Sequence, residues 1–176
     1  MQQNKPNITL RPLTTSDGDY LDSVSDERSF HYTKQSPDAP LVHPTVLEWD
    51  SPIRRIDRIS FAILADDQLV GEVSLTGIDL DERIATITMG IAVQANRNQT
   101  IGSTALAQVL TYAFYSLGLN QLTAATLSTN LPAINCLEKG GFKLTGTERY
   151  ALQMANLQMD RLHYTITLDE FRYVPL

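Results

Sequence analysis

The sequence predicts a single α/β domain built around a mixed sheet. Several segments alternate apolar and polar residues with the period of two that is typical of strands, and other segments carry apolar residues at helical spacing. The 176 residues are enough for one domain and too few for two full ones. We therefore expect residues 1–176 to form one domain.

The N-terminal third is expected to hold one strand, one helix and a long loop. Ile8–Arg11 alternates like a strand, and Thr14–Asp17 can cap the helix that follows. Between His31 and Pro52, four prolines disfavour central strands and long helices, so this stretch is expected to be a loop with short helical pieces. Ser51–Pro52 is a favourable helix start and predicts a short helix through about Arg58.

From Ser60 onwards the pattern is that of strands. Ser60–Leu64 and Leu69–Leu75 are separated by a short polar turn, which predicts a hairpin. Ile84–Val93 predicts a third strand, in which threonines stand between apolar neighbours. Three consecutive antiparallel strands are the simplest arrangement of these segments.

The C-terminal half adds two helices and three strands. A helix is expected over 105–117, where apolar residues recur on one face, and Gly118 ends it. In chain order, the other expected elements are a strand at 122–127, a short helix begun by Asn130 and stopped by Gly140, a strand from Phe142 that breaks at Gly146, and a last strand at 162–168.

Composition excludes several classes of protein. The net charge of −6 argues against a nucleic-acid partner, because phosphate binding relies on clustered Lys and Arg; an acidic surface suits cationic acceptors such as amines. The lone Cys136 excludes an internal disulfide, and with only three His the sequence argues against a metal site. No apolar run approaches the roughly 20 residues of a membrane span, and the first residues show no signal-peptide pattern. We therefore expect a cytoplasmic protein with no membrane partner.

Residues 88–103 form a strand–loop–helix junction. Such a junction directs backbone N–H groups and the positive end of the helix dipole to one point, which suits a pyrophosphate. Gly102 allows a close approach of the backbone, Ser103 offers a hydroxyl, and Arg97 can reach a phosphate. Taken alone, however, a helix N-terminus with one glycine favours a purely structural loop.

Four segments, taken together and in order, change this interpretation. They are Thr9–Leu13 with Asp17, Arg97-x-x-Thr-x-Gly102, Asn130–Phe142, and Asn156–Asp160 followed by Tyr164 and Glu170-Phe171. In this order they resemble the GNAT superfamily of acyl-CoA-dependent N-acetyltransferases, in the branch of ribosomal-protein alanine N-acetyltransferases. The resemblance implies a mixed, mostly antiparallel sheet that is flanked by helices and splayed at the cofactor strand. It also implies acetyl-CoA as co-substrate, no metal, and the option of a homodimer.

The resemblance implies a cofactor site along the junction and the helix after it. Strand backbone would pair with the pantetheine arm and loop amides would hold the pyrophosphate, although the strand residues can equally be plain buried positions. Asn130 would bind the cofactor or merely cap its helix, and Asn135 is about as consistent with a solvated residue. The residues implied for cofactor binding are Ile91, Ala92, Val93, Arg97, Asn98, Gln99, Thr100, Ile101, Gly102, Ser103, Asn130 and Asn135.

The catalytic groups of the family are matched only in part. Thr100 replaces the first glycine of the loop, and a β-branched residue resists positive φ. Leu137 stands where many members carry the Tyr that protonates the leaving thiolate. Transfer to an amine needs a proton acceptor, and the family's Glu position falls near Thr86. Glu72, on the neighbouring strand, is the nearest carboxylate and our candidate base, directly or through water; a solvent-facing role fits its position equally well.

Other residues offer further chemistry. His31 and His43 lie in the irregular segment and could serve as bases when neutral. Asp160 and Tyr164 are expected to position other groups rather than to carry protons. Cys136 is expected to be a small core residue and not a nucleophile.

We therefore expect an acetyl-CoA-dependent N-acetyltransferase that transfers the acetyl group directly to a primary amine within a ternary complex. The acceptor would be a protein N-terminus or a small amine such as a polyamine or an antibiotic. The alternative is a non-catalytic acyl-CoA-binding or regulatory module of the same fold, which Thr86, Thr100 and Leu137 favour. A nucleotide-binding protein is disfavoured because the expected glycines and lysine are missing.

Overall fold

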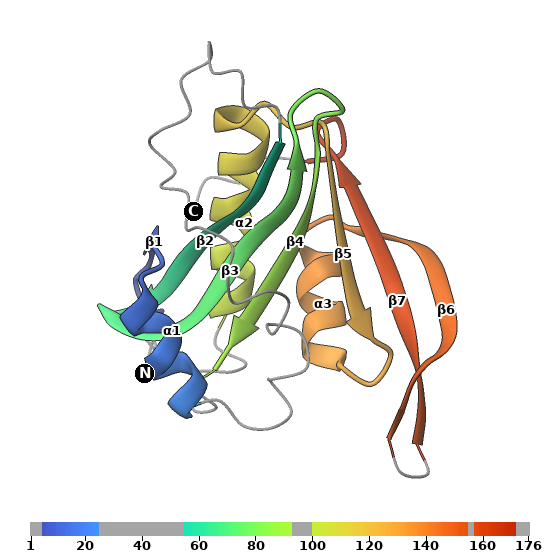
Figure 1. Ribbon diagram of the computed structural model, residues 1–176, viewed down its shortest axis with the longest axis horizontal. Coiled ribbons are helices and arrows are strands. Elements are labelled where there is room, and N and C mark those ends of the chain that lie inside the picture. The colour runs from blue at the N-terminus through green and yellow to red at the C-terminus, as the bar shows by residue number, and fades with distance from the viewer. Residues whose placement is uncertain (1–4, 25–54, 93–99, 155–156, 172–176) are drawn as a thin grey trace.

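Seven strands form one sheet, in the order β1-β2-β3-β4-β5-β7-β6 (Figure 1). The computed structural model describes residues 5–24, 55–92, 100–154 and 157–171. The elements are β1 (Ile8–Pro12), α1 (Thr15–Val24), β2 (Arg55–Ala65), β3 (Gln68–Asp79), β4 (Ile84–Ile91), α2 (Ile101–Thr111) with a π-helical continuation η2 (Tyr112–Ser116), β5 (Gln121–Leu127), α3 (Leu131–Lys139), β6 (Lys143–Met154) and β7 (Leu157–Thr167).

The sheet is mixed, as predicted. All neighbouring strands pair antiparallel except β4 and β5, which are parallel. The predicted series of three consecutive antiparallel strands is confirmed by β2, β3 and β4. A parallel pair requires a crossover connection, and α2 lies in the chain between these two strands.

Helices cover both faces of the sheet. In Figure 1, α1 lies in front of the strands and α2 behind them, and α3 packs on the same side as α2. We call the α1 side the front face. The main core fills the space behind the sheet, where Ile87 of β4, Leu106 of α2 and Leu137 of α3 join one cluster of buried side chains. None of the helices in the described residues combines the length and apolar character needed to cross a bilayer.

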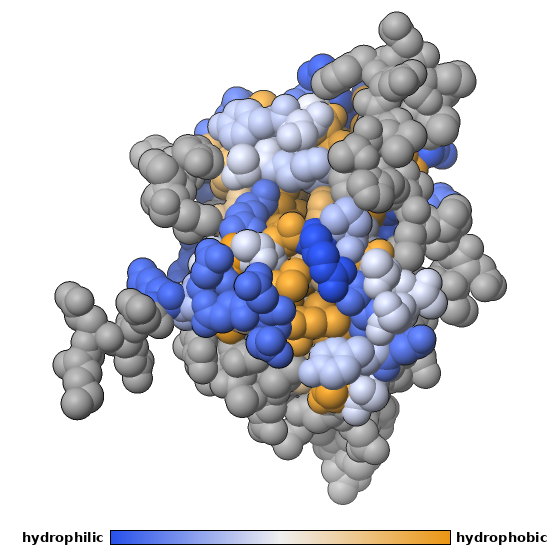
Figure 2. Space-filling model, turned by 90° about the vertical axis from the view of Figure 1, so that its left-hand side faces the viewer, coloured by the Kyte–Doolittle hydropathy of each residue, from blue (hydrophilic) through white to orange (hydrophobic). Residues whose placement is uncertain are grey.

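The outer edge of β1 is covered by α2. Gln108 of α2 donates a hydrogen bond from Nε2 to the carbonyl of Ile8 at 2.9 Å. Viewed from this side, the molecule shows apolar residues between polar ones (Figure 2). An uncovered edge strand invites pairing with another chain, and this side-chain bond occupies one backbone acceptor of that edge.

An ion pair fixes the corner between β1 and α1. Arg11 donates to both carboxylate oxygens of Asp17, at 2.5 and 2.7 Å, and the amide and hydroxyl of Thr14 donate to the same carboxylate at 2.8 and 2.6 Å. Asp17 is buried although it is charged. The Arg11 guanidinium therefore holds the pKa of Asp17 well below its usual range.

The structure corrects two expectations. The prediction of a short helix through about Arg58 is wrong for residues 55–58, the part of it that the structure describes. These residues belong to β2, and Ile56 is buried opposite Ile78 of β3. The strand expected to break at Gly146 continues as β6. Thr145 is instead the extra residue of a bulge, and its hydroxyl donates to the carbonyl of His163 at 3.2 Å, which replaces the missing strand pairing.

Replacing Asp17 with Asn should lower the free energy of unfolding by about 2 kcal/mol at pH 7, because charged hydrogen bonds are lost. The depressed pKa of Asp17 means that its contribution is present at neutral pH and is lost as the pH falls below about 4. Urea unfolding at pH 7, 5 and 3 should therefore show the gap between wild type and variant shrinking with acidity. Asp19→Asn, an exposed carboxylate on the same helix, should change stability by less than about 0.5 kcal/mol. A gap independent of pH would contradict this account.

Candidate active site

A wedge opens between β4 and β5. The two strands pair only through Ile84–Thr86 and Gln121–Thr123, and beyond this point no described strand pairs with that edge of β4. The last pair is joined by a hydrogen bond of 3.0 Å between the Thr86 and Thr123 hydroxyls. At the other end of this short ladder, the carbonyl of Arg83 accepts hydrogen bonds from the amides of Asn120 and Gln121. The splay that the resemblance implied is therefore present.

The open edge of β4 presents backbone groups to the wedge. The amide of Ala92 donates to the carbonyl of Val70 on β3 at 2.9 Å, so it points away from the wedge. Because polar backbone groups alternate sides along a strand, those of Ile91 face the wedge. Of the predicted strand residues that the structure describes, Ile91 thus directs its backbone groups into the wedge, and Ala92 is buried.

The path of β4 depends on a glycine on β3. A Cβ built on Gly71 would overlap the carbonyl oxygen of Gly90 and would lie 3.0 Å from the Cα of Ile91. A side chain at Gly71 would therefore push the open end of β4 out of place. A Cβ on Gly90 meets nothing within 4 Å.

We expect Gly71→Ala to weaken acetyl-CoA binding by more than about tenfold and to cost about 1–3 kcal/mol of stability, because the overlap displaces β4. Thermal melts of the purified chain with increasing acetyl-CoA would measure both effects. Gly90→Ala, one strand away, should leave the melting temperature of the free protein almost unchanged. Equal behaviour of the two variants would show that β4 does not depend on Gly71.

The side chain of Thr100 does not cap the backbone donors in the first turn of α2. Thr100, the residue before the helix, makes no side-chain capping bond, and its carbonyl accepts bonds from the Thr104 amide and the Ser103 hydroxyl. Ser103 therefore uses its hydroxyl within the helix and not as a cap. The amides of Ile101 and Gly102 lie at the positive end of the helix dipole, where an anion is favoured. This donor set fits a pyrophosphate.

Thr100 adopts the conformation that its side chain disfavours. Its φ is 56°, in the left-handed region that costs an L-residue about 1–2 kcal/mol. The threonine therefore keeps its backbone in the left-handed region, and its carbonyl accepts hydrogen bonds from the first turn of α2.

Replacing Thr100 with Gly should raise the free energy of unfolding by about 1 kcal/mol, since glycine occupies positive φ without strain. Urea unfolding would measure the change. Thr104→Gly, inside the same helix, should lower stability by about 1 kcal/mol because glycine is a poor helix former. A loss of stability in both variants would mean that Thr100 is not strained.

The middle of α3 lies beside the first turn of α2. A Cβ built on Gly102 would lie 3.5 Å from the Cε of Met89 on β4 and 3.6 Å from the Sγ of Cys136 on α3. Burial raises the pKa of the Cys136 thiol to about 11, so at neutral pH the sulfur stays protonated and is a poor nucleophile. This agrees with the structural role expected for Cys136.

The two asparagines of the predicted site differ. Asn130 caps α3 by accepting a bond from the Ala133 amide at 3.3 Å, and its side chain remains exposed with an NH2 group that can still donate. Asn135 is exposed and lies one residue, about 100° around the helix, from Cys136, which faces α2. The geometry brings Asn130 to the start of α3 at the end of the wedge and leaves Asn135 on the solvent side.

Glu72, the predicted base, lies on the front face of β3. It is half-buried and pairs across the strands with Gly90 of β4. Because Gly90 has no side chain and a Cβ there would meet open space, the approach from Glu72 toward the wedge is not blocked by that residue. Leu137 is buried and supplies no acid.

The other predicted positioning residues are held in the sheet. Asp160 accepts the Tyr150 amide at 2.9 Å, and its own amide donates to the Ser128 hydroxyl at 3.3 Å. The Tyr164 hydroxyl donates to Glu138 of α3 at 3.3 Å. Burial, together with the Glu138 carboxylate, raises the pKa of Tyr164, so it stays protonated at neutral pH. The predicted residues Val93, Arg97, Asn98, Gln99, His31 and His43 lie outside the described residues.

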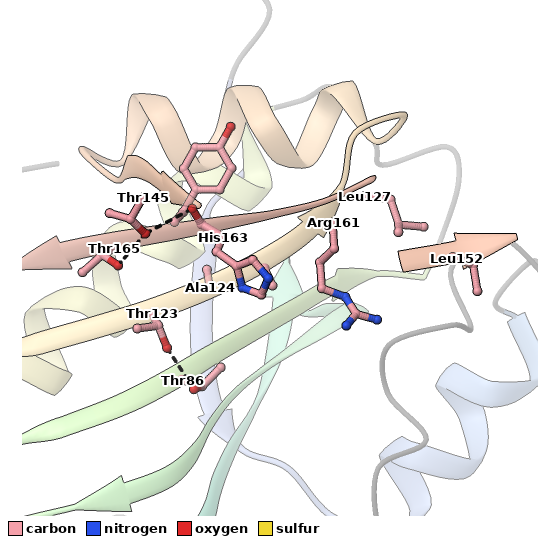
Figure 3. A pocket seen from close by; sticks show the side chains of 11 residues that line it. Thr86, Thr123, Ala124, Leu127, Thr145, Leu152, Arg161, His163 and Thr165 are labelled. Atoms are coloured by element: carbon pink, nitrogen blue, oxygen red, sulfur yellow. Dashed lines mark hydrogen bonds between the residues drawn. The ribbon is translucent and has the colours of Figure 1, made fainter. Parts of the chain in front are cut away.

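A hollow on the front face was not predicted from the sequence. It has a volume of about 520 Å³ and lies over β5, β6 and β7 beside the apex of the wedge (Figure 3). We call it the front hollow. Its lining consists of Thr86, Thr123, Ala124, Ala125, Leu127, Thr145, Leu152, Arg161, His163, Tyr164 and Thr165. The alternation of residues along β7 predicts that Arg161, His163 and Thr165 share one face of the sheet. That this face lies next to the wedge follows only from the strand order, in which β7 is the neighbour of β5.

Comparison with known proteins gives consistent results. Residues 7–143 match the family model of the acetyltransferase (GNAT) domain. A probable N-acetyltransferase, YjcK of Bacillus subtilis, is 27% identical over 157 residues, covering 81% of this chain and 83% of its own. A putative ribosomal N-acetyltransferase of the same organism, YdaF, is 24% identical and covers 93% of both chains.

The fold has close structural neighbours. A crystal structure of a spermidine N-acetyltransferase from Vibrio cholerae, in complex with CoA and spermine, superposes with a TM-score of 0.72 at 19% identity and covers 93% of this chain and 96% of that one. At this identity the likeness concerns the fold alone. Because the family model spans most of the sequence, the chain belongs to the GNAT family of acetyltransferases, whose members use acetyl-CoA as the acetyl donor.

Proposed function

We propose that residues 1–176 form one N-acetyltransferase domain that moves the acetyl group of acetyl-CoA directly to a primary amine. The observation that carries this proposal is the wedge, at which the open edge of β4 and the uncapped first turn of α2 meet. Strand-edge groups suit the amide-bearing pantetheine arm, and helix N–H groups suit the pyrophosphate. The expected cytoplasmic location is part of the same proposal.

The donor supplies an activated thioester, and the protein supplies position and a proton acceptor. In the proposed reaction, the neutral amine attacks the thioester carbon, the N–C bond forms, and the C–S bond breaks. Glu72 takes the proton from the amine, directly or through water. Leu137 occupies the position of the family's acid and cannot donate a proton, so the leaving thiolate would take its proton from solvent.

The acceptor belongs to one of two classes. The relative named as a putative ribosomal N-acetyltransferase supports a protein N-terminus, and the spermidine acetyltransferase with the same fold supports a small polyamine. We propose a primary amine in the front hollow or at its mouth, because that face borders both Glu72 and the wedge.

Thiol release from acetyl-CoA should be saturable with one class in a panel of Ala-, Ser- and Met-starting peptides, polyamines, aminoglycosides and amino acids. Gly102→Glu should weaken acetyl-CoA binding by more than about tenfold, since it places a carboxylate at the pyrophosphate position. Gly102→Ala is the matched control, because its Cβ makes only ordinary contacts of 3.5 and 3.6 Å, and it should bind normally.

Two results would contradict the proposal. Unchanged acetyl-CoA affinity in Gly102→Glu, measured by calorimetry on a variant that melts normally, would show that the pyrophosphate lies elsewhere. Binding of acetyl-CoA without turnover of any amine would favour the non-catalytic acyl-CoA-binding module.

A further inference from the structure

A row of side chains crosses the front face at the open end of the wedge. Thr86 and Thr123 form the last pair of β4 with β5, and Gly90 and Leu127 each lie four residues further along their strands. Cross-strand pairing then extends the row on both sides. In order across the face, the row consists of Glu72, Gly90, the wedge, Leu127, Arg161 and Glu148.

Arg161 enters this row with hydrogen-bond donors to spare. Its Nη1 donates to Oε2 of Glu148 at 3.0 Å, while its Nε is buried and has no hydrogen-bond partner among the described residues. A guanidinium carries five N–H donors in a planar fork that matches carboxylate and carbonyl oxygens. The Arg161 side chain is 37% exposed, so its Nη groups, and not the buried Nε, are the donors that a ligand oxygen can reach.

On the β7 side of the wedge, the Glu148 carboxylate already interacts with Arg161 and lies near His163. Oε2 of Glu148 accepts from Arg161 and lies 3.7 Å from Nε2 of His163. The hydroxyls of Thr86 and Thr123 bond to each other, as do those of Thr145 and Thr165. This part of the described hollow therefore offers donors for an oxygen but no unshared carboxylate for a second cation.

We infer that Arg161 selects acceptors whose amine stands next to a carbonyl or carboxylate oxygen, namely amino acids or peptide N-termini, and disfavours polyamines. The inference rests on the proposed function and deepens it. The guanidinium binds the oxygen on the β7 side of the wedge, and the adjoining amine lies toward Glu72 on the β3 side. A polyamine brings further positive charge beside Arg161 and has no oxygen to bind it.

A matched pair of acceptors tests this inference. L-Alaninamide and L-alaninol differ in the carbonyl next to the amine, and thiol release from acetyl-CoA reports turnover of either one. Arg161→Gln should raise the KM for alaninamide about tenfold or more, leave the KM for acetyl-CoA unchanged, and alter turnover of alaninol by less than about twofold. Comparing each acceptor between wild type and variant removes the difference in amine pKa.

Two further variants separate this role from a structural one. Arg161→Lys keeps the charge but not the fork, and should recover only part of the alaninamide KM. Arg55→Gln removes an exposed guanidinium that also pairs with one carboxylate, Asp79 of β3, and should leave both acceptors unaffected. Thermal melts establish that each variant is folded.

The outcomes distinguish this inference from the proposed function. Equal losses for alaninamide and alaninol in Arg161→Gln, or a wild-type preference for spermidine over alanine-starting peptides, would overturn the role of Arg161 while leaving the acetyltransferase intact. Absence of turnover with every amine would overturn the proposed function itself, and the inference with it.

Discussion

The parallel pairing of β4 with β5 stops after three residue pairs, and this limit governs the arrangement of the rest of the molecule. β4 stays paired with β3 through Ile91, and β5 stays paired with β7 along its whole length. Each strand therefore follows the twist of a different half of the sheet once the shared ladder ends. The Arg83 carbonyl closes the start of the shared ladder, and the Thr86–Thr123 hydroxyl bond lies at its end, where the two strands part. In a continuous sheet the backbone groups of both strands would be consumed, and no edge would remain for a ligand.

The wedge places different chemistry on the two faces of one sheet. Behind the sheet, the first turn of α2 lies beside β4 and the middle of α3, and its backbone donors suit anions. In front, Thr86 of β4 and Arg161 of β7 line the hollow, and Glu72 of β3 lies on the same face. The proposed donor and acceptor would then enter from opposite sides and meet only between the strands, which suits a reaction that needs proximity more than a strong catalyst.

Much of the fold followed from local sequence patterns. Alternation and helical spacing correctly predicted three antiparallel strands in succession and the helices after them. The error at residues 55–58 came from giving a Ser–Pro helix start more weight than the alternation of Arg55, Ile56 and Asp57. Pairing with β3 across the sheet, which local propensity does not contain, decides that segment. Likewise, the bulge at Thr145 depends on β7 as its partner.

Only part of the candidate site could be predicted from the sequence, again because strand pairing across the sheet is not encoded locally. The loop motif and the α3 motif are each a short continuous segment, so their residues could be named from the sequence. The left-handed φ of Thr100 could not, because it opposes the local preference of a β-branched residue. Arg161 could not be found, because β7 lies between β5 and β6. That order brings residues more than thirty positions apart, such as Leu127 and Arg161, into one row, and no local pattern encodes it.

The empty space over Gly90 has a bearing on how this enzyme could diversify. A side chain there would meet nothing within 4 Å, so substitutions of increasing size need not disturb the packing that folding requires. Yet each would project between Glu72 and the wedge and shorten the room for an incoming amine. A substitution at Gly90 therefore costs little stability but changes the size of the acceptor that fits. At such a position, single substitutions can change the acceptor during evolution.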